Sequence, residues 1–159
     1  MTSTILVPAI GRLRALLPLV IALGGAACEP ASGACAVSPP EGWSAASVRW
    51  DGTCTAGRAE GAGVLKEQQG AGVGRLFFGN VVHGELQLGV IDVPEQGYRA
   101  GRFEHGRLTS SDDRQVFIAA FDAAAKAADA AADRFEQAGN AASARFYRAK
   151  AKALREQMD

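Results

Sequence analysis

The chain of 159 residues lacks an excess of either charge, because 17 lysines and arginines balance 17 aspartates and glutamates. Proteins that bind nucleic acids need a basic surface that neutralises phosphates. Neither sign dominates any long stretch of this sequence, so no nucleic-acid partner is expected. The length is that of one domain with room for one modest hydrophobic core.

Groups that carry catalysis or bind metals are also scarce. Only two histidines occur, His83 and His105, and neither has a cysteine or carboxylate at metal-ligand spacing, whereas zinc normally takes at least three protein ligands. The glycine-rich stretch "GAGVGR" lacks the Lys-Ser/Thr that follows in a phosphate loop. We therefore predict a protein that is not an enzyme and that needs no metal or cofactor. Solvated surface is the expectation for the scattered glutamates Glu60, Glu67, Glu85 and Glu104.

No apolar run near the N-terminus is long enough to span a bilayer stably. The run "ALLPLVIAL" follows Arg12 and Arg14, small residues come after it, and no acid precedes Glu29. This order is typical of an export signal, which we assign to residues 1–27. A buried core helix is the alternative interpretation of the same run.

The signal ends in "GAAC", which resembles the lipobox of bacterial lipoproteins, although that family usually has leucine where Gly25 stands. The resemblance implies that Cys28 is acylated and becomes the first residue of a mature protein anchored in the cell envelope, for example at the outer membrane facing the periplasm. The alternative is ordinary signal cleavage, which would give a soluble periplasmic protein. Membrane contact is expected through the lipid anchor only.

Lipidation of Cys28 would leave Cys35 and Cys54 as the remaining cysteines of the chain. Exported proteins rarely keep an unexplained thiol, so a Cys35–Cys54 disulfide is expected rather than a nucleophilic Cys54. The bridge would close a loop of about 20 residues and stabilise the fold by roughly 3 kcal/mol. Residues 28–48 are rich in Pro, Ser, Ala and Gly, and we predict that they form a flexible tether.

Glycine is concentrated in the middle of the chain, where 13 of the 19 glycines fall between Gly52 and Gly106. Three similar units recur there, with first glycines 27 and 22 residues apart. Alternate residues of a strand share one face, so a glycine two places after an aromatic residue leaves bare backbone that a ring can cover. The last glycine of each unit suits a turn with positive φ. Each unit therefore predicts a short hairpin that stacks on the next. The units are Trp50-x-Gly52-x-Cys54-x-x-Gly57, Phe77-x-Gly79-x-Val81-x-x-Gly84 and Gly101-x-Phe103-x-x-Gly106.

The first unit, with Gly61 and Gly63 after it, resembles the MORN repeat (membrane occupation and recognition nexus) at every marked position. The second unit has Gly89 in place of that pair, and in the third Tyr98 precedes its expected place by one residue. The resemblance covers about residues 50–108 within a region that we delimit as 49–109. It implies an elongated antiparallel sheet of hairpins with a scaffolding role and no catalytic residue. A meander of ordinary glycine-rich hairpins is the alternative.

Residues 110–159 have a helical pattern. Ser110 or Ser111 is the expected N-cap, and Gly139 and Asn140 divide two helices, although one continuous helix with a stutter is possible. Residues 112–138 carry a net charge of −3 and residues 140–159 one of +3, which favours an antiparallel helical hairpin. The first apolar stripe is Phe117, Phe121, Ala124, Ala128, Ala131, Phe135 and Ala138. The second is Ala142, Phe146, Ala149 and Ala153, and the phenylalanines of both are candidates for packing on the sheet.

The sequence thus predicts an α+β fold, a small antiparallel sheet of MORN-like hairpins followed by an alanine-rich helical hairpin. The expected function is that of a cell-envelope interaction scaffold, binding an envelope protein through Trp43, the exposed sheet face or the helical pair. The alternative is a periplasmic module that binds lipid headgroups, glycans or peptidoglycan through the aromatic residues of the sheet.

Overall fold

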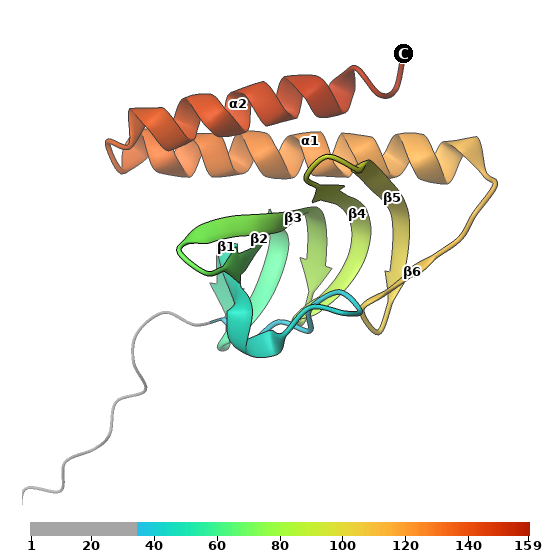
Figure 1. The fold of residues 1–159 in the computed structure, drawn as a ribbon, viewed down its shortest axis with the longest axis horizontal. Coiled ribbons are helices and arrows are strands. Elements are labelled where there is room, and N and C mark those ends of the chain that lie inside the picture. The colour runs from blue at the N-terminus through green and yellow to red at the C-terminus, as the bar shows by residue number, and fades with distance from the viewer. Residues whose placement is uncertain (1–34) are drawn as a thin grey trace, which may run out of the picture. The chain divides into compact units, whose positions relative to one another are not determined.

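The computed structural model describes residues 35–159, so the predicted export signal, Cys28 and the first part of the predicted tether lie outside the described residues. The described chain is an antiparallel sheet followed by two helices, which confirms the α+β prediction (Figure 1). Its elements are the 3-10 helix η1 (Ala45–Ser47), β1 (Val48–Thr55), β2 (Arg58–Gln69), β3 (Gly72–Val82), β4 (Glu85–Val93), β5 (Gly97–Glu104), β6 (Arg107–Thr109), α1 (Arg114–Gln137) and α2 (Ala141–Arg155).

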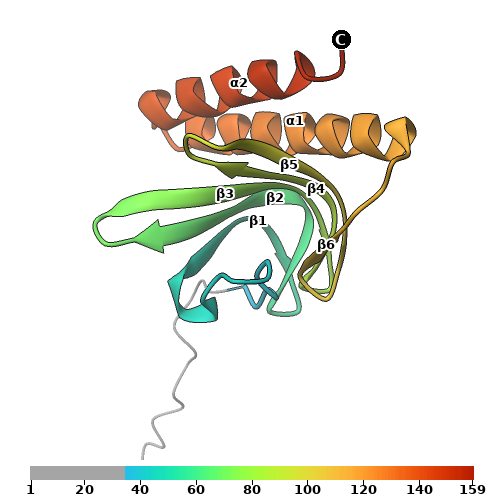
Figure 2. The ribbon, with the colours of Figure 1, turned by 45° about the vertical axis from the view of Figure 1, so that its right-hand side comes forward.

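The six strands pair in sequence order, so the sheet is a simple meander that curves along its length (Figure 2). Three of its turns come from the repeat units and lie between β1 and β2, β3 and β4, and β5 and β6. Both central residues of each turn have positive φ, which is the geometry of the tight type I′ hairpin. The predicted turn glycines are therefore confirmed. The central pairs are Ala56-Gly57, His83-Gly84 and His105-Gly106.

A row of glycines crosses the sheet, because Gly63, Gly79, Gly89 and Gly101 are direct partners on β2 to β5. Aromatic rings lie on this row, as the repeat pattern predicts. A Cβ atom on Gly79 or Gly89 would come within 2.7 or 2.8 Å of the Phe77 ring. The bare backbone of the row is therefore occupied by side chains from the same face of the sheet.

The Trp50 ring lies on the first hairpin in the same way. A Cβ atom on Gly52 or Gly63 would come within 2.5 Å of its indole carbons. Phe103, from the third unit, packs edge-on against Phe77 with ring centroids 5.2 Å apart. The uneven spacing of the glycines thus places a bare position beneath each of the Trp50 and Phe77 rings.

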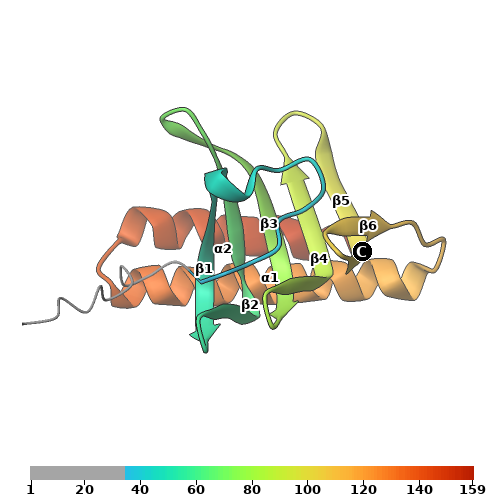
Figure 3. The same ribbon diagram turned by 90° about the horizontal axis from the view of Figure 1, so that it is seen from below.

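Residues 35–47, here called the strap, cover this face of the sheet (Figure 3). Each repeat turn accepts one hydrogen bond of 2.8 Å from a strap amide, through the carbonyl oxygen of its glycine. The prediction of a flexible tether is therefore wrong for this segment. The strap has few apolar residues, but it is ordered because its backbone hydrogen bonds to the turns add to the packing. The donor and acceptor pairs are Ala36 to Gly57, Ser38 to Gly84 and Glu41 to Gly106.

Two side chains fix the ends of the strap. Cys35 forms the expected disulfide with Cys54, with 5.7 Å between their Cα atoms. Trp43 is only 7% exposed and packs with Leu65, Phe77 and other residues of this face. The strap is thus held covalently at one end and by a buried indole at the other.

Helix α1 lies across the opposite face of the sheet, and α2 packs on α1 (Figure 2). The buried side of α1 is mostly alanine, which lets the helix approach Val64, Phe78 and Val90 closely. Phe121 is buried there, whereas Phe117 is 44% exposed. The buried alanines of α1 are Ala120, Ala123, Ala124, Ala125, Ala127, Ala128, Ala131 and Ala132.

The helical hairpin is confirmed, with one correction at its start. Asp113 is the N-cap of α1, accepting a 2.8 Å hydrogen bond from the Gln115 amide, so neither Ser110 nor Ser111 has that role. Gly139 has a φ of +74° and Asn140 caps α2, as predicted. Arg148 pairs with Asp133 and Glu136 across the two helices, in line with their opposite charges.

We expect Gly79→Ala to destabilise the fold by about 3 kcal/mol, because its Cβ atom would lie 2.3 Å from the Leu88 carbonyl oxygen and against the Phe77 ring. Gly72→Ala is the matched control on the same strand, since its Cβ atom would meet nothing closer than 3.8 Å. The control should stay within about 1 kcal/mol of the natural protein. Urea unfolding of both variants measures the difference, and equal stabilities would contradict the packing described for the glycine row.

Candidate functional site

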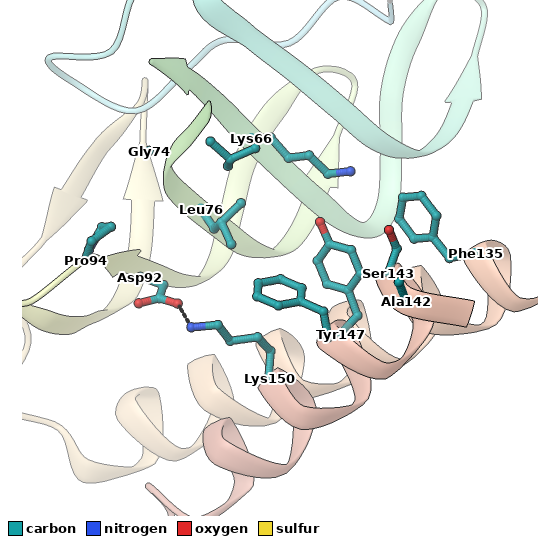
Figure 4. A pocket seen from close by; sticks show the side chains of 12 residues that line it. Lys66, Gly74, Leu76, Asp92, Pro94, Phe135, Ala142, Ser143, Tyr147 and Lys150 are labelled. Atoms are coloured by element: carbon teal, nitrogen blue, oxygen red, sulfur yellow. Dashed lines mark hydrogen bonds and ion pairs between the residues drawn. The ribbon is translucent and has the colours of Figure 1, made fainter. Parts of the chain in front are cut away.

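A groove of about 600 Å³ opens between α2 and the ends of strands β2 to β4 (Figure 4). Sites for drug-sized ligands have volumes of roughly 300–1,000 Å³ and are mostly apolar with a few polar groups. This groove has that composition. Its lining consists of Lys66, Val73, Gly74, Leu76, Asp92, Pro94, Phe135, Ala142, Ser143, Phe146, Tyr147 and Lys150.

The groove exists because the strands end at different places. β3 begins at Gly72, but its pairing with β4 reaches only to Leu76, which faces Asp92. Residues 72–75 of β3, here called the ledge, therefore have no partner on the β4 side within the described sheet. Pro94 follows β4 directly and has no amide proton, so it cannot extend the pairing. Val73, on the ledge, is 53% exposed.

Aromatic side chains form the wall opposite the ledge. Phe135 of α1 stacks on Tyr147 of α2, with centroids 5.4 Å apart and planes 7° from parallel. Phe146 stands nearly perpendicular to Tyr147 at 5.0 Å. Tyr147 is 5% exposed, whereas Phe146 is 46% exposed. The wall thus presents one large ring to solvent beside a ring that the fold itself buries.

The apolar stripe expected on α2 is not the buried face of this helix. The buried residues of α2 are Ala144, Tyr147, Ala151 and Leu154. The prediction of a buried stripe through Ala142, Phe146, Ala149 and Ala153 is therefore wrong. A tyrosine and a leucine fill the space against α1 better than the alanines of the predicted face. Ala142, Phe146 and Ala149 are consequently left at the surface, and the first two of them line the groove.

Positive charge is in surplus at one end of the groove. The Lys66 ammonium lies 2.8 Å from Asp51 and above the rings of Phe135 and Tyr147, at 4.8 and 5.4 Å from their centroids. Asp51 also pairs with Arg134 at 3.0 Å. One carboxylate thus forms ion pairs with two cations, and the three groups carry a net charge of +1.

The opposite end is electrically balanced. Lys150 of α2 pairs with Asp92 of β4 at 2.5 Å, which joins the second helix to the sheet. The Lys150 ammonium lies 5.7 Å from the centroid of the Phe146 ring. The half-exposed Phe146 side chain is therefore placed beside a neutral ion pair.

Tyr147 contributes a hydrogen-bond donor near the positive end. Burial raises the pKa of its phenol, and the nearby charge of Lys66 opposes that shift only in part. The hydroxyl therefore keeps its proton at neutral pH. Figure 4 shows this hydroxyl directed toward the Lys66 side chain. An ammonium and a phenol together favour an anionic acceptor at this end of the groove.

The repeat residues, Trp43 and the two histidines singled out from the sequence lie outside the groove lining. The rings and glycines of the repeats belong to the packed sheet, and Trp43 of the strap is buried against that sheet. His83 and His105 occupy exposed turns, with the His83 Nδ1 atom 3.5 Å from Glu60. Residues 35–159 contain no group of three or more His, Cys, Asp or Glu side chains placed to hold a metal ion.

Glu67 is a buried carboxylate that the sequence does not distinguish from surface glutamates. It is 6% exposed and receives two hydrogen bonds from Arg75, of 2.6 Å to Oε2 and 2.5 Å to Oε1. The Arg75 guanidinium also lies 5.0 Å from the Trp43 ring and donates to the Gly42 carbonyl oxygen. The pair therefore ties the strap to the β2–β3 hairpin and is structural.

In comparisons with known proteins, no family model, no curated protein and no solved structure matches this chain. The resemblance to the MORN repeat thus stays a prediction from the residues quoted above. None of the helices among the described residues is long and apolar enough to cross a membrane.

We predict that Glu67→Gln lowers the free energy of unfolding at pH 7 by about 2 kcal/mol, because hydrogen bonds to a charged group are lost. The bonds from Arg75 hold the pKa of Glu67 below its ordinary value of 4.5, more than offsetting burial. The pair thus contributes stability above pH 4.5, and that contribution is lost as the pH falls through the folded value. Urea unfolding from pH 7 to pH 3 should show the natural protein converging on the variant, and a constant gap would contradict this.

Proposed function

We propose that this chain is a non-enzymatic binding protein of the cell envelope that holds a protein partner in the groove. The observation that carries the proposal is the pair of half-exposed apolar side chains, Val73 and Phe146, on either side of a 600 Å³ groove with an aromatic wall. Exposed apolar side chains that gather around a concavity are typical of interaction sites.

The packing of the sheet supports the groove over the other surfaces expected for docking. The strap covers one face and α1 covers the other. Phe77 and Phe103 are at most 4% exposed, and Trp43 is 7% exposed. A module that bound lipid headgroups or glycans through the aromatic residues of the sheet would have few rings to offer. This arrangement favours the scaffold over that alternative.

The cysteines support export. The Cys35–Cys54 disulfide is of a kind that forms and persists in oxidising compartments. Its formation leaves Cys28 as the remaining thiol of the chain, in the position that the lipobox-like "GAAC" assigns to acylation. We infer that the first 27 residues direct export and that Cys28 anchors the mature protein in the envelope.

Mass spectrometry of the mature protein tests this part of the proposal. We expect an N-terminal Cys28 that carries acyl chains, together with an intact Cys35–Cys54 bridge. Cys28→Ser should abolish acylation, because serine lacks the thiol that carries the acyl chain. Without buried acyl chains the protein should move from the membrane fraction to the soluble fraction. An unmodified N-terminus at any other residue would overturn the anchoring proposal.

Photo-crosslinking in the cells that produce the protein tests the groove. A benzoylphenylalanine introduced in place of Phe146 should form a discrete protein adduct, because this ring is half-exposed at the groove. The matched control replaces Gln87, an exposed residue of β4 far from Pro94. Adducts of the same size from both positions, or none from position 146, would contradict docking in the groove.

A further inference from the structure

We propose that the groove takes an extended apolar peptide segment that carries an acidic side chain, and that Lys66 and Tyr147 receive this acid. The inference rests on the proposed function, since it specifies the chemistry of the protein partner. It commits to polypeptide rather than to a lipid or a small molecule. Three features of the groove support it, one for the side chains, one for the charge and one for the backbone.

The apolar part of the segment is specified by the walls. Leu76 is 7% exposed and Tyr147 of the aromatic wall 5%, so packing in the core already fixes the position of both side chains. Val73 and Phe146 lie beside these two residues in the groove lining, and each is about half exposed. Aromatic and aliphatic anchors in a pre-formed concavity are the groups that contribute most to binding at protein interfaces. The partner side chains that fit here are aliphatic or aromatic.

The acidic part is specified by charge complementarity. Asp51 serves both Lys66 and Arg134, which leaves one positive charge without an anion of its own. The Lys66 ammonium faces the groove, and the protonated hydroxyl of Tyr147 is directed toward it. A carboxylate placed between them would accept charge-assisted hydrogen bonds from both. Such a bond at the edge of an apolar groove fixes the register of the bound segment.

A cationic segment is disfavoured by the same geometry. The faces of Phe135 and Tyr147 are already occupied by the Lys66 ammonium, and that of Phe146 lies near the Lys150 ammonium. Cations bind aromatic rings over the ring face. An incoming lysine or arginine would therefore compete with the chain's own lysines and meet their repulsion.

The extended backbone is specified by the ledge. Residues 72–75 of β3 have no strand partner on the β4 side within the described sheet. An extended peptide can add to such an edge through main-chain hydrogen bonds. Gly72 has no side chain at this edge, and a Cβ atom there would meet nothing closer than 3.8 Å, whereas Gly74 has the Gln69 side chain against it. A fatty acyl chain has no groups that could form these bonds, so the ledge favours polypeptide.

Selection of a phage-displayed library of random 12-residue peptides on the purified mature protein tests the proposal. We expect enrichment of apolar residues together with at least one Asp or Glu. Replacing that acid by its amide in the strongest peptide should weaken binding about tenfold, because a charge-assisted bond to Lys66 is lost. Calorimetric titration of the two peptides measures the ratio. Enrichment of basic peptides, or equal affinity of acid and amide, overturns the proposal.

Two substitutions at Ala142, an exposed residue of the groove lining, give a matched pair that leaves the Lys66 and Tyr147 side chains intact. Glutamate and lysine are both good helix formers, so both variants should keep the fold. Ala142→Lys should tighten binding of the selected peptide about threefold, and Ala142→Glu should weaken it by a similar factor. Ala119→Glu, at an exposed position on α1 away from the groove lining, should leave affinity unchanged. Identical affinities for the two Ala142 variants would overturn the acidic assignment.

Dodecanoate is the competing probe for a lipid occupant. It should fail to displace the selected peptide, and its displacement of every enriched peptide would overturn the choice of polypeptide. The outcomes also separate this inference from the proposed function. A protein adduct at position 146 without any preference for acidic peptides leaves the proposed function standing and removes the inference. Acidic peptides that bind in vitro without any adduct in cells would leave the acidic-peptide chemistry of the groove standing and remove the proposed function.

Discussion

The contact of aromatic rings with bare backbone is the interaction on which the rest of the structure depends. Trp50 covers Gly52 and Gly63, and Phe77 covers Gly79 and Gly89. Because glycines stand opposite one another on four strands, the rings can lie directly against the backbone of the sheet. The rings therefore stay close to the backbone of the sheet, and the short strap is enough to cover this face without a second sheet or a helix.

The coverage of both sheet faces determines which surfaces of the molecule stay open. The strap and α1 cover the two faces, and the aromatic residues of the repeats pack within the fold. The groove arises from a mismatch at the ends of the strands, where β3 extends past its pairing with β4 and α2 stands opposite. Its aromatic wall belongs to the helices, and its charge comes from a carboxylate that is shared by two cations. Repeat and site are thus separate parts of the molecule.

Local patterns in the sequence predict the hairpins, the three tight turns and the division of the helices at Gly139, because each depends on residues close in the chain. The Cys35–Cys54 bridge follows from the cysteine count instead. The strap could not be predicted, since its hydrogen bonds join residues up to 65 apart, such as Glu41 and Gly106. The buried face of α2 differs from the predicted one because Tyr147 and Leu154 fill the interface with α1 better than alanine does. The groove depends on strand lengths and on that face together, so no single motif indicates it.

The disulfide and the strap have a mechanical consequence. Cys35 begins the strap and is bonded to Cys54 at the end of β1. A pull on the chain upstream of Cys35 therefore enters the first hairpin through a covalent bond, and the amides of Ala36, Ser38 and Glu41 carry no load. The protein can be held under tension from its leading end without peeling that segment from its three turns.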